Sequence, residues 1–215
     1  MLTESTIQGL IYTHVILGAI ALLTGSLSLI VKKGGFLHRK SGLVFVFTML
    51  VSAIMSMTVA VQPNHISPFL LSVGILTIYF VIGGYLALRY KKKYVNLIAD
   101  KCLALAMLVI GIAMMSHPLF LNHVNIVMIV FGVLGTIFAV KDFANFYFHE
   151  ELHKQWLTLH LGKITGGYIS AFTAFIVVNQ FLPGIIGWIL PGIIGGVFIA
   201  IWTRKVKNGQ MSLRK

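Results

Sequence analysis

The stretch ISPFLLSVGILTIYFVIGGYLAL, residues 66–88, decides the fold class. It contains no Lys, Arg, Asp, Glu or His. It is long enough for an α-helix to cross the roughly 30 Å hydrocarbon core of a bilayer. A membrane-spanning strand would instead need shorter segments of alternating hydrophobicity. This stretch is therefore predicted to be a transmembrane helix.

Similar apolar segments follow one another along the chain, each about 19–25 residues long, as spanning helices require. They are predicted at residues 10–31, 41–61, 66–88, 95–116, 124–148, 156–178 and 184–202. The composition agrees, because 58% of the 215 residues are hydrophobic and only 10% are charged. We predict an all-α integral membrane protein of seven transmembrane helices, with residues 1–215 forming a single polytopic domain.

The positive charge indicates an orientation. The formal net charge of +12 arises from 17 Lys and Arg against 5 Asp and Glu. The basic residues cluster at the ends of the apolar runs, all on one predicted side, at 32–40, 89–101, 141–163 and 204–215. This placement is typical of contact with lipid headgroups, so we expect the bilayer, and no nucleic acid, as a partner. By the positive-inside rule, the N-terminus lies outside and the C-terminus lies in the cytoplasm, with the protein in the cytoplasmic membrane of the cell.

Two smaller patterns concern the packing of the helices. Glycines four residues apart, Gly162 with Gly166 and Gly192 with Gly196, are typical of helices whose backbones approach closely. Asp100 stands beside Lys101, and Asp142 beside Lys141, which indicates charge pairing near the membrane interface.

The predicted topology sorts the histidines into two layers. The outer layer contains His14, His65, His117 and His123, and the cytoplasmic layer contains His38, His149, His153 and His160. A haem b held by two histidines needs one imidazole from each of two helices at matching depth, with basic residues for its propionates. His38 and His160 meet this requirement on the cytoplasmic side, where Arg39 and Lys40 are near. His14 and His117 form the corresponding outer pair. Two such pairs, one per leaflet, are similar in arrangement to di-haem cytochromes of the b561 type.

A different site is indicated by the stretch His149-Glu150-Glu151-Leu152-His153. Histidines four residues apart share one face of a helix, and a neighbouring glutamate can activate a zinc-bound water. In this alternative His149 and His153 bind zinc, Glu150 is the catalytic base, and His160 or Asp142 provides a third ligand. The competing interpretation is a solvated loop between two spanning helices.

The chain also resembles a known family through several short motifs. These are His14-x-x-x-Gly18 with Gly25, Gly35-x-x-His38-Arg39-x-x-Gly42, and a third region that runs from His153 or Trp156 through His160 to Thr165-Gly166-Gly167-Tyr168-Ile169 and Thr173-Ala174-Phe175. They resemble a bacterial family of multi-pass membrane proteins that is classed as a domain of unknown function. The resemblance implies no activity, but it favours His14, His38 and His160 as site residues.

Three functional hypotheses follow from these patterns. The leading one is redox chemistry with a haem b-type cofactor bound by histidine pairs. The second is a zinc-dependent membrane hydrolase, and the third is a membrane scaffold or assembly factor whose histidines are structural. Whether the protein is an enzyme is left open by the sequence.

Overall fold

The computed structural model describes residues 2–121 and 125–209, except for the side chains at positions 118–121 and 149. Within them the fold is all-α, with a short 3₁₀ helix, η1, after the third helix. The elements are α1 (Glu4–Ile30), α2 (Phe36–Ala60), α3 (Pro68–Leu86), η1 (Ala87–Lys91), α4 (Ile98–Leu121), α5 (Ile126–Tyr147), α6 (His149–Val178) and α7 (Gly184–Lys207). Seven of these helices, α3 being counted together with η1, are long and apolar enough to cross a membrane, which confirms the predicted fold class.

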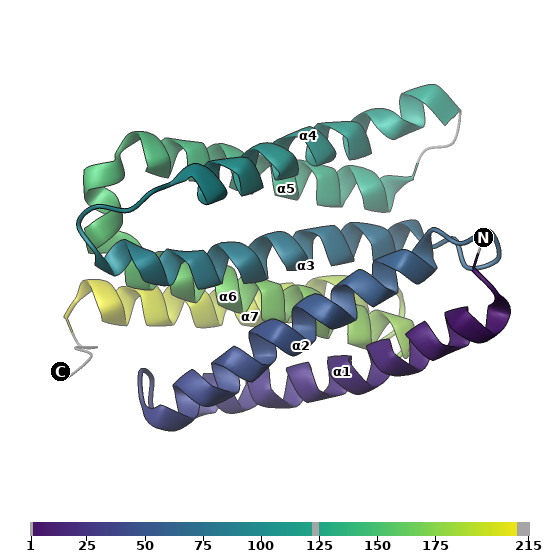
Figure 1. The fold of residues 1–215 in the computed structure, drawn as a ribbon, viewed down its shortest axis with the longest axis horizontal. Coiled ribbons are helices and arrows are strands. Elements are labelled where there is room, and N and C mark those ends of the chain that lie inside the picture. The colour runs from purple at the N-terminus through teal and green to yellow at the C-terminus, as the bar shows by residue number, and fades with distance from the viewer. Residues whose placement is uncertain (1, 122–124, 210–215) are drawn as a thin grey trace.

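The two central helices are α3 and α6, which pack against each other along their lengths (Figure 1). The α1–α2 hairpin covers one side of this pair, and the α4–α5 hairpin covers the other. The last helix, α7, packs against α6. Large apolar side chains such as Tyr12, Leu23 and Ile193 remain exposed around the bundle, as a lipid-facing surface requires.

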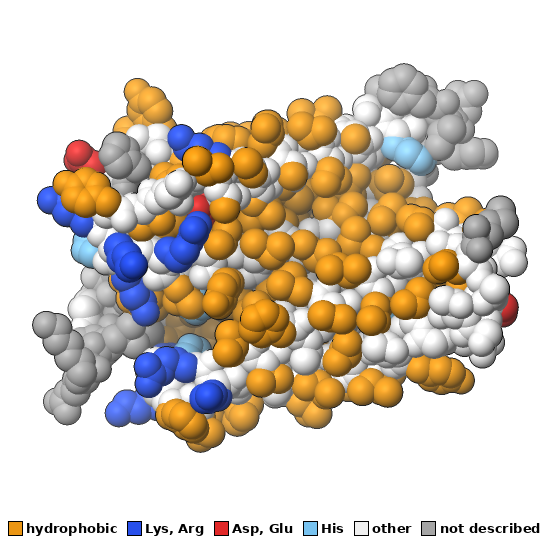
Figure 2. Space-filling model, in the orientation of Figure 1, with side chains coloured by type: hydrophobic (Ala, Val, Ile, Leu, Met, Phe, Trp, Pro, Cys, Tyr) orange, Lys and Arg blue, Asp and Glu red, His pale blue; other side chains and the backbone are white. Residues whose placement is uncertain are grey.

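Lys and Arg side chains gather at one end of the bundle, called the basic end below (Figure 2). This end contains the turn between α1 and α2, η1, the start of α6 and the last turn of α7. The opposite end shows no Lys or Arg on the face drawn in Figure 2. The charge asymmetry predicted from the loops is thus present in the folded chain.

Several helices extend beyond the predicted apolar segments. Thr3 caps α1, because its side chain accepts a hydrogen bond from the backbone N–H of Thr6 at 3.3 Å, so the helix begins at Glu4 rather than near residue 10. At the basic end α2 begins at Phe36 and α6 at His149. A helix can continue past the hydrocarbon because water or headgroups accept its polar side chains. The predicted start of the fifth segment at Val124 lies outside the described residues.

The glycines divide into two groups. A Cβ on Gly84 of α3 would lie 2.7 Å from the backbone nitrogen of Ile164 on α6, so the central pair depends on glycine at this position. Gly166 packs against Phe80, whereas Gly162, Gly192 and Gly196 face open space. The prediction that the Gly192 and Gly196 pair packs against another helix is therefore wrong for this chain on its own.

Candidate functional site

A cavity of about 950 Å³ lies at the basic end, where the α1–α2 hairpin diverges from the central pair α3 and α6. Its walls come from α1, α2 and the turn between them, from the end of α3 with η1, and from α6. The face drawn in Figure 2 is hollowed beside the basic end, and histidine atoms are visible inside the hollow. Apolar side chains line most of the interior, and they include Leu43, Phe45, Leu88 and Ile164.

His38 enters this cavity from the first turns of α2. The chain reverses between α1 and α2 at Gly34, whose φ of 76° is readily adopted only by glycine. The reversal places the Nδ1 nitrogen of His38 at 3.0 Å from the carbonyl oxygen of Ser28 on α1. A carbonyl oxygen only accepts hydrogen bonds, so Nδ1 carries the proton. In the neutral ring, Nε2 then has a free lone pair.

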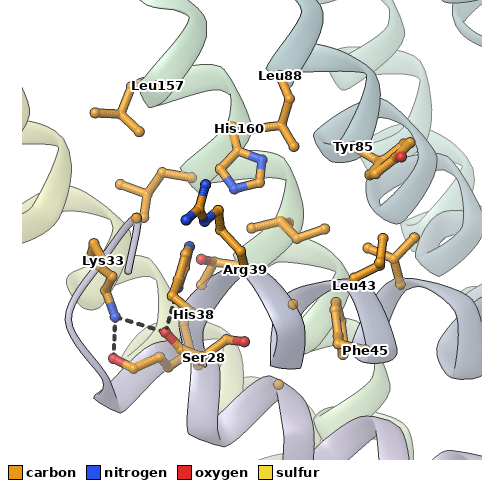
Figure 3. A pocket seen from close by; sticks show the side chains of 18 of the residues that line it. Ser28, Lys33, His38, Arg39, Leu43, Phe45, Tyr85, Leu88, Leu157 and His160 are labelled. Atoms are coloured by element: carbon orange, nitrogen blue, oxygen red, sulfur yellow. Dashed lines mark hydrogen bonds between the residues drawn. The ribbon is translucent and has the colours of Figure 1, made fainter. Parts of the chain in front are cut away.

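His160 enters from the opposite wall, on α6. Its Nδ1 nitrogen lies 2.8 Å from the carbonyl oxygen of Gly84 on α3, so this imidazole has the same tautomer as His38. Both side chains are half-buried. Figure 3 shows the two rings pointing toward the same space, with the side chain of Arg39 reaching into it. The structure therefore brings His38 and His160 together at one cavity.

Basic side chains surround the mouth of the cavity: Lys32, Lys33, Arg39 and Lys91. The ammonium group of Lys33 donates to the carbonyl oxygens of Ser28, at 3.1 Å, and Leu29 (Figure 3). Burial lowers the pKa of Lys33 below its ordinary value. Lys91 lies over the ring of Trp156, 4.4 Å from its centroid. No Asp or Glu is among the described residues that line the cavity, so the site favours a ligand with negative charge at one end.

The proposed outer pair is not brought together. His14 on α1 hydrogen-bonds to α2, with Nδ1 at 2.9 Å from the carbonyl oxygen of Ser52 and 2.8 Å from its hydroxyl. His117 belongs to α4. Among the described residues α1 and α4 make no contact, and Figure 1 shows them on opposite sides of α3. Equal depth in the membrane does not by itself make two helices neighbours.

The HEELH stretch is helical, since it forms the first turns of α6 rather than a loop. The Nδ1 nitrogen of His153 lies 3.3 Å from the carbonyl oxygen of Tyr90, and Glu150 is exposed. The side chain of His149 lies outside the described residues, so the predicted His149–His153 pair is not tested. Among the residues that the structure describes, no three His, Cys, Asp or Glu side chains converge.

Asp142, the other predicted metal ligand, belongs to a buried cluster. Its carboxylate accepts from the hydroxyl of Tyr79 on α3, at 2.5 Å, and pairs with Lys163 on α6. Asp100 forms a similar cluster with Arg89, at 2.5 Å, and the hydroxyl of Tyr90, at 2.6 Å. The sequence neighbours Lys141 and Lys101 are thus not the partners. The sequence-based predictions did not include these two clusters. The position of Asp142 within a membrane-spanning segment was a signal for one of them, because an acidic side chain there usually has a partner.

No family model, curated protein or solved structure matches the chain. The resemblance to a family of unknown function remains a prediction.

Proposed function

We propose that this multi-pass membrane protein binds a haem b-type redox cofactor between His38 and His160. The observation that carries the proposal is that both imidazoles line one cavity while each donates its Nδ1 proton to a backbone carbonyl of a neighbouring helix. Metal-ligating histidines usually have such a partner, because it fixes the ring and raises the basicity of the other nitrogen. The two Nε2 atoms would then be free to hold the haem iron.

The rest of the cavity fits the chemical character of haem. Its volume of about 950 Å³ is at the upper end of the range for small-molecule sites, about 300–1,000 Å³. Apolar residues such as Phe45 and Ile164 suit a hydrophobic macrocycle. The guanidinium of Arg39 and the lysines at the mouth suit the propionates, because charge-assisted hydrogen bonds to carboxylates are strong. Arg39 is exposed and can swing toward such a group.

The chain's own residues would bind and orient the cofactor. Ser28 and Gly84 hold the imidazole rings through their carbonyl oxygens, and the apolar walls exclude water. Bound haem would supply reversible one-electron chemistry.

Absorption spectroscopy with iron analysis of the purified protein, alone and after addition of haemin, tests this function. We expect one haem per chain with the spectrum of two histidine ligands. His38→Ala and His160→Ala should each weaken binding at least tenfold, because even partners of metal ligands typically contribute about 10- to 100-fold. His65→Ala is the control, since His65 contacts Glu4 at 3.3 Å, near the start of α1. Absence of haem binding, or equal binding by all three variants, would disprove the proposal.

The orientation is part of the same proposal. The gathering of Lys and Arg at the basic end supports a cytoplasmic location for this end, in the cytoplasmic membrane. The cofactor would then lie near the cytoplasmic surface.

A further inference from the structure

A second hollow, of about 300 Å³, lies at the basic end between η1, the segment leading into α4 and the first turns of α6. It shares no lining residue with the cavity of His38 and His160. The proposed haem site does not use it, although it contains His153 of the HEELH stretch.

Hydrogen-bond donors dominate the polar part of this hollow. Lys92 and Lys93 contribute exposed ammonium groups. The ring of His153 also lines the hollow, with its Nδ1 nitrogen 3.3 Å from the carbonyl oxygen of Tyr90. The Oδ1 atom of Asn96 accepts from the backbone N–H of Ile98 at 2.9 Å, so its amide nitrogen also remains available to donate.

Among the described residues, no Asp or Glu lines the hollow to neutralise these donors. Two nearby acids already have partners. Asp100 is bound by Arg89 and Tyr90, and Glu151 pairs with Lys154 at 2.8 Å. Two lysines and an amide around one hollow therefore favour an anion with several acceptor oxygens.

The other wall of the hollow is apolar. Val95, Leu97 and Leu152 line it, and Leu152 is buried in the protein. The hollow also lies at the end of a transmembrane bundle, where lipid headgroups are located. A ligand with a phosphate and an adjoining hydrocarbon part matches both walls.

We propose that this hollow binds the phosphate group of an anionic membrane lipid, with a preference for a phosphomonoester such as phosphatidic acid. A phosphomonoester has a charge of about −1.5 to −2 near neutral pH and three acceptor oxygens, so it suits the donors better than a phosphodiester. The site needs no haem and stands apart from the proposed function.

Native mass spectrometry of the full chain tests the proposal, after reconstitution in bilayer discs of phosphatidylcholine with a small fraction of phosphatidic acid. The wild type should retain phosphatidic acid selectively. Lys92→Gln with Lys93→Gln should weaken retention on the order of 20-fold, about fivefold for each lysine near the membrane surface. Lys205→Gln with Lys207→Gln removes equal charge from the last turn of α7, away from the hollow, and should leave retention within about twofold of the wild type.

Equal losses in the two lysine pairs would show general surface attraction and overturn the proposal. Equal retention of phosphatidic acid and phosphatidylcholine by the wild type would also overturn the proposal. Displacement of the lipid by millimolar inorganic phosphate would identify free phosphate as the ligand. Haem binding should be unchanged in all these variants, so the two proposals fail separately.

Discussion

The Nδ1 nitrogen of His160 on α6 lies 2.8 Å from the carbonyl oxygen of Gly84 on α3. This contact is possible because the two backbones approach so closely that a Cβ on Gly84 would lie 2.7 Å from the nitrogen of Ile164. Gly84 therefore has two roles: it allows the two central helices to pack closely, and its carbonyl oxygen orients an imidazole of the proposed site.

Gly84→Ala should affect stability and cofactor binding together. The added methyl group must push α3 and α6 apart, at a cost of about 1–3 kcal/mol, as is typical of overpacking. The shift also removes the hydrogen bond that orients His160, so haem affinity should fall at least tenfold, within the about 10- to 100-fold range typical for lost partners of metal ligands. Thermal unfolding in detergent and a haemin titration measure the two effects.

Gly162→Ala is the matched control on α6, because a Cβ there meets nothing within 4 Å. Alanine favours a helix over glycine by about 1 kcal/mol, so this variant should be at least as stable as the wild type. Wild-type stability in Gly84→Ala would contradict the close contact of α3 and α6.

Lys163→Met should be strongly destabilising, because it leaves the carboxylate of Asp142 buried without its cation. Breaking a buried ion pair in this way typically costs about 3–5 kcal/mol. The double variant Asp142→Leu, Lys163→Met removes both charges and should recover most of the loss, with the hydroxyl of Tyr79 left to find another partner. Unfolding free energies of the single and double variants measure this recovery.

The exposed pair of Glu151 and Lys154 provides the comparison for the buried one. Glu151→Gln should cost less than about 1 kcal/mol, because water screens an exposed pair. If the Asp142→Leu, Lys163→Met double variant were as unstable as Lys163→Met alone, altered packing rather than the unpaired charge would explain the loss of stability.

The sequence predicted the number and class of the helices because each crossing requires about 20 apolar residues, which are visible as local runs. It did not predict the ends of these helices. A cap such as Thr3, or a helix that continues into polar residues as α6 does, lies outside the apolar run. Hydropathy therefore gives the span and not the full helix.

Partners across helices were predicted only in part. Depth grouped His38 with His160, which line one cavity, but it grouped His14 with His117 as well, and in the described part of the chain their helices make no contact. Asp142 was matched to its neighbour Lys141, although adjacent residues on a helix point to different sides. Its partner Lys163 is on another helix, and only the packing of α5 and α6 against α3 makes the contact.

The proposed orientation predicts the compartment of each end. A reporter fused after Lys215 should be active in the cytoplasm, and reporters inserted after Asn64 or Gln180 should be active on the outer side, because the basic end remains inside. Reporter pairs that are active in opposite compartments measure this directly. A cytoplasmic signal at Asn64 or Gln180 would contradict the orientation.

The HEELH stretch should not be a zinc site. Among the described residues no three His, Cys, Asp or Glu side chains converge, and the carboxylate of Asp142, one of the two predicted third ligands, is already bound by Tyr79 and Lys163. Protein prepared with added zinc should therefore have the same metal content in the wild type, His149→Ala and His153→Ala, as measured by elemental analysis. His153→Ala should instead lose about 0.5–1.5 kcal/mol of stability, because one hydrogen bond between α6 and η1 is removed. Stoichiometric zinc in the wild type that disappears in both variants would restore the zinc hypothesis, since both imidazoles must then converge on one metal ion.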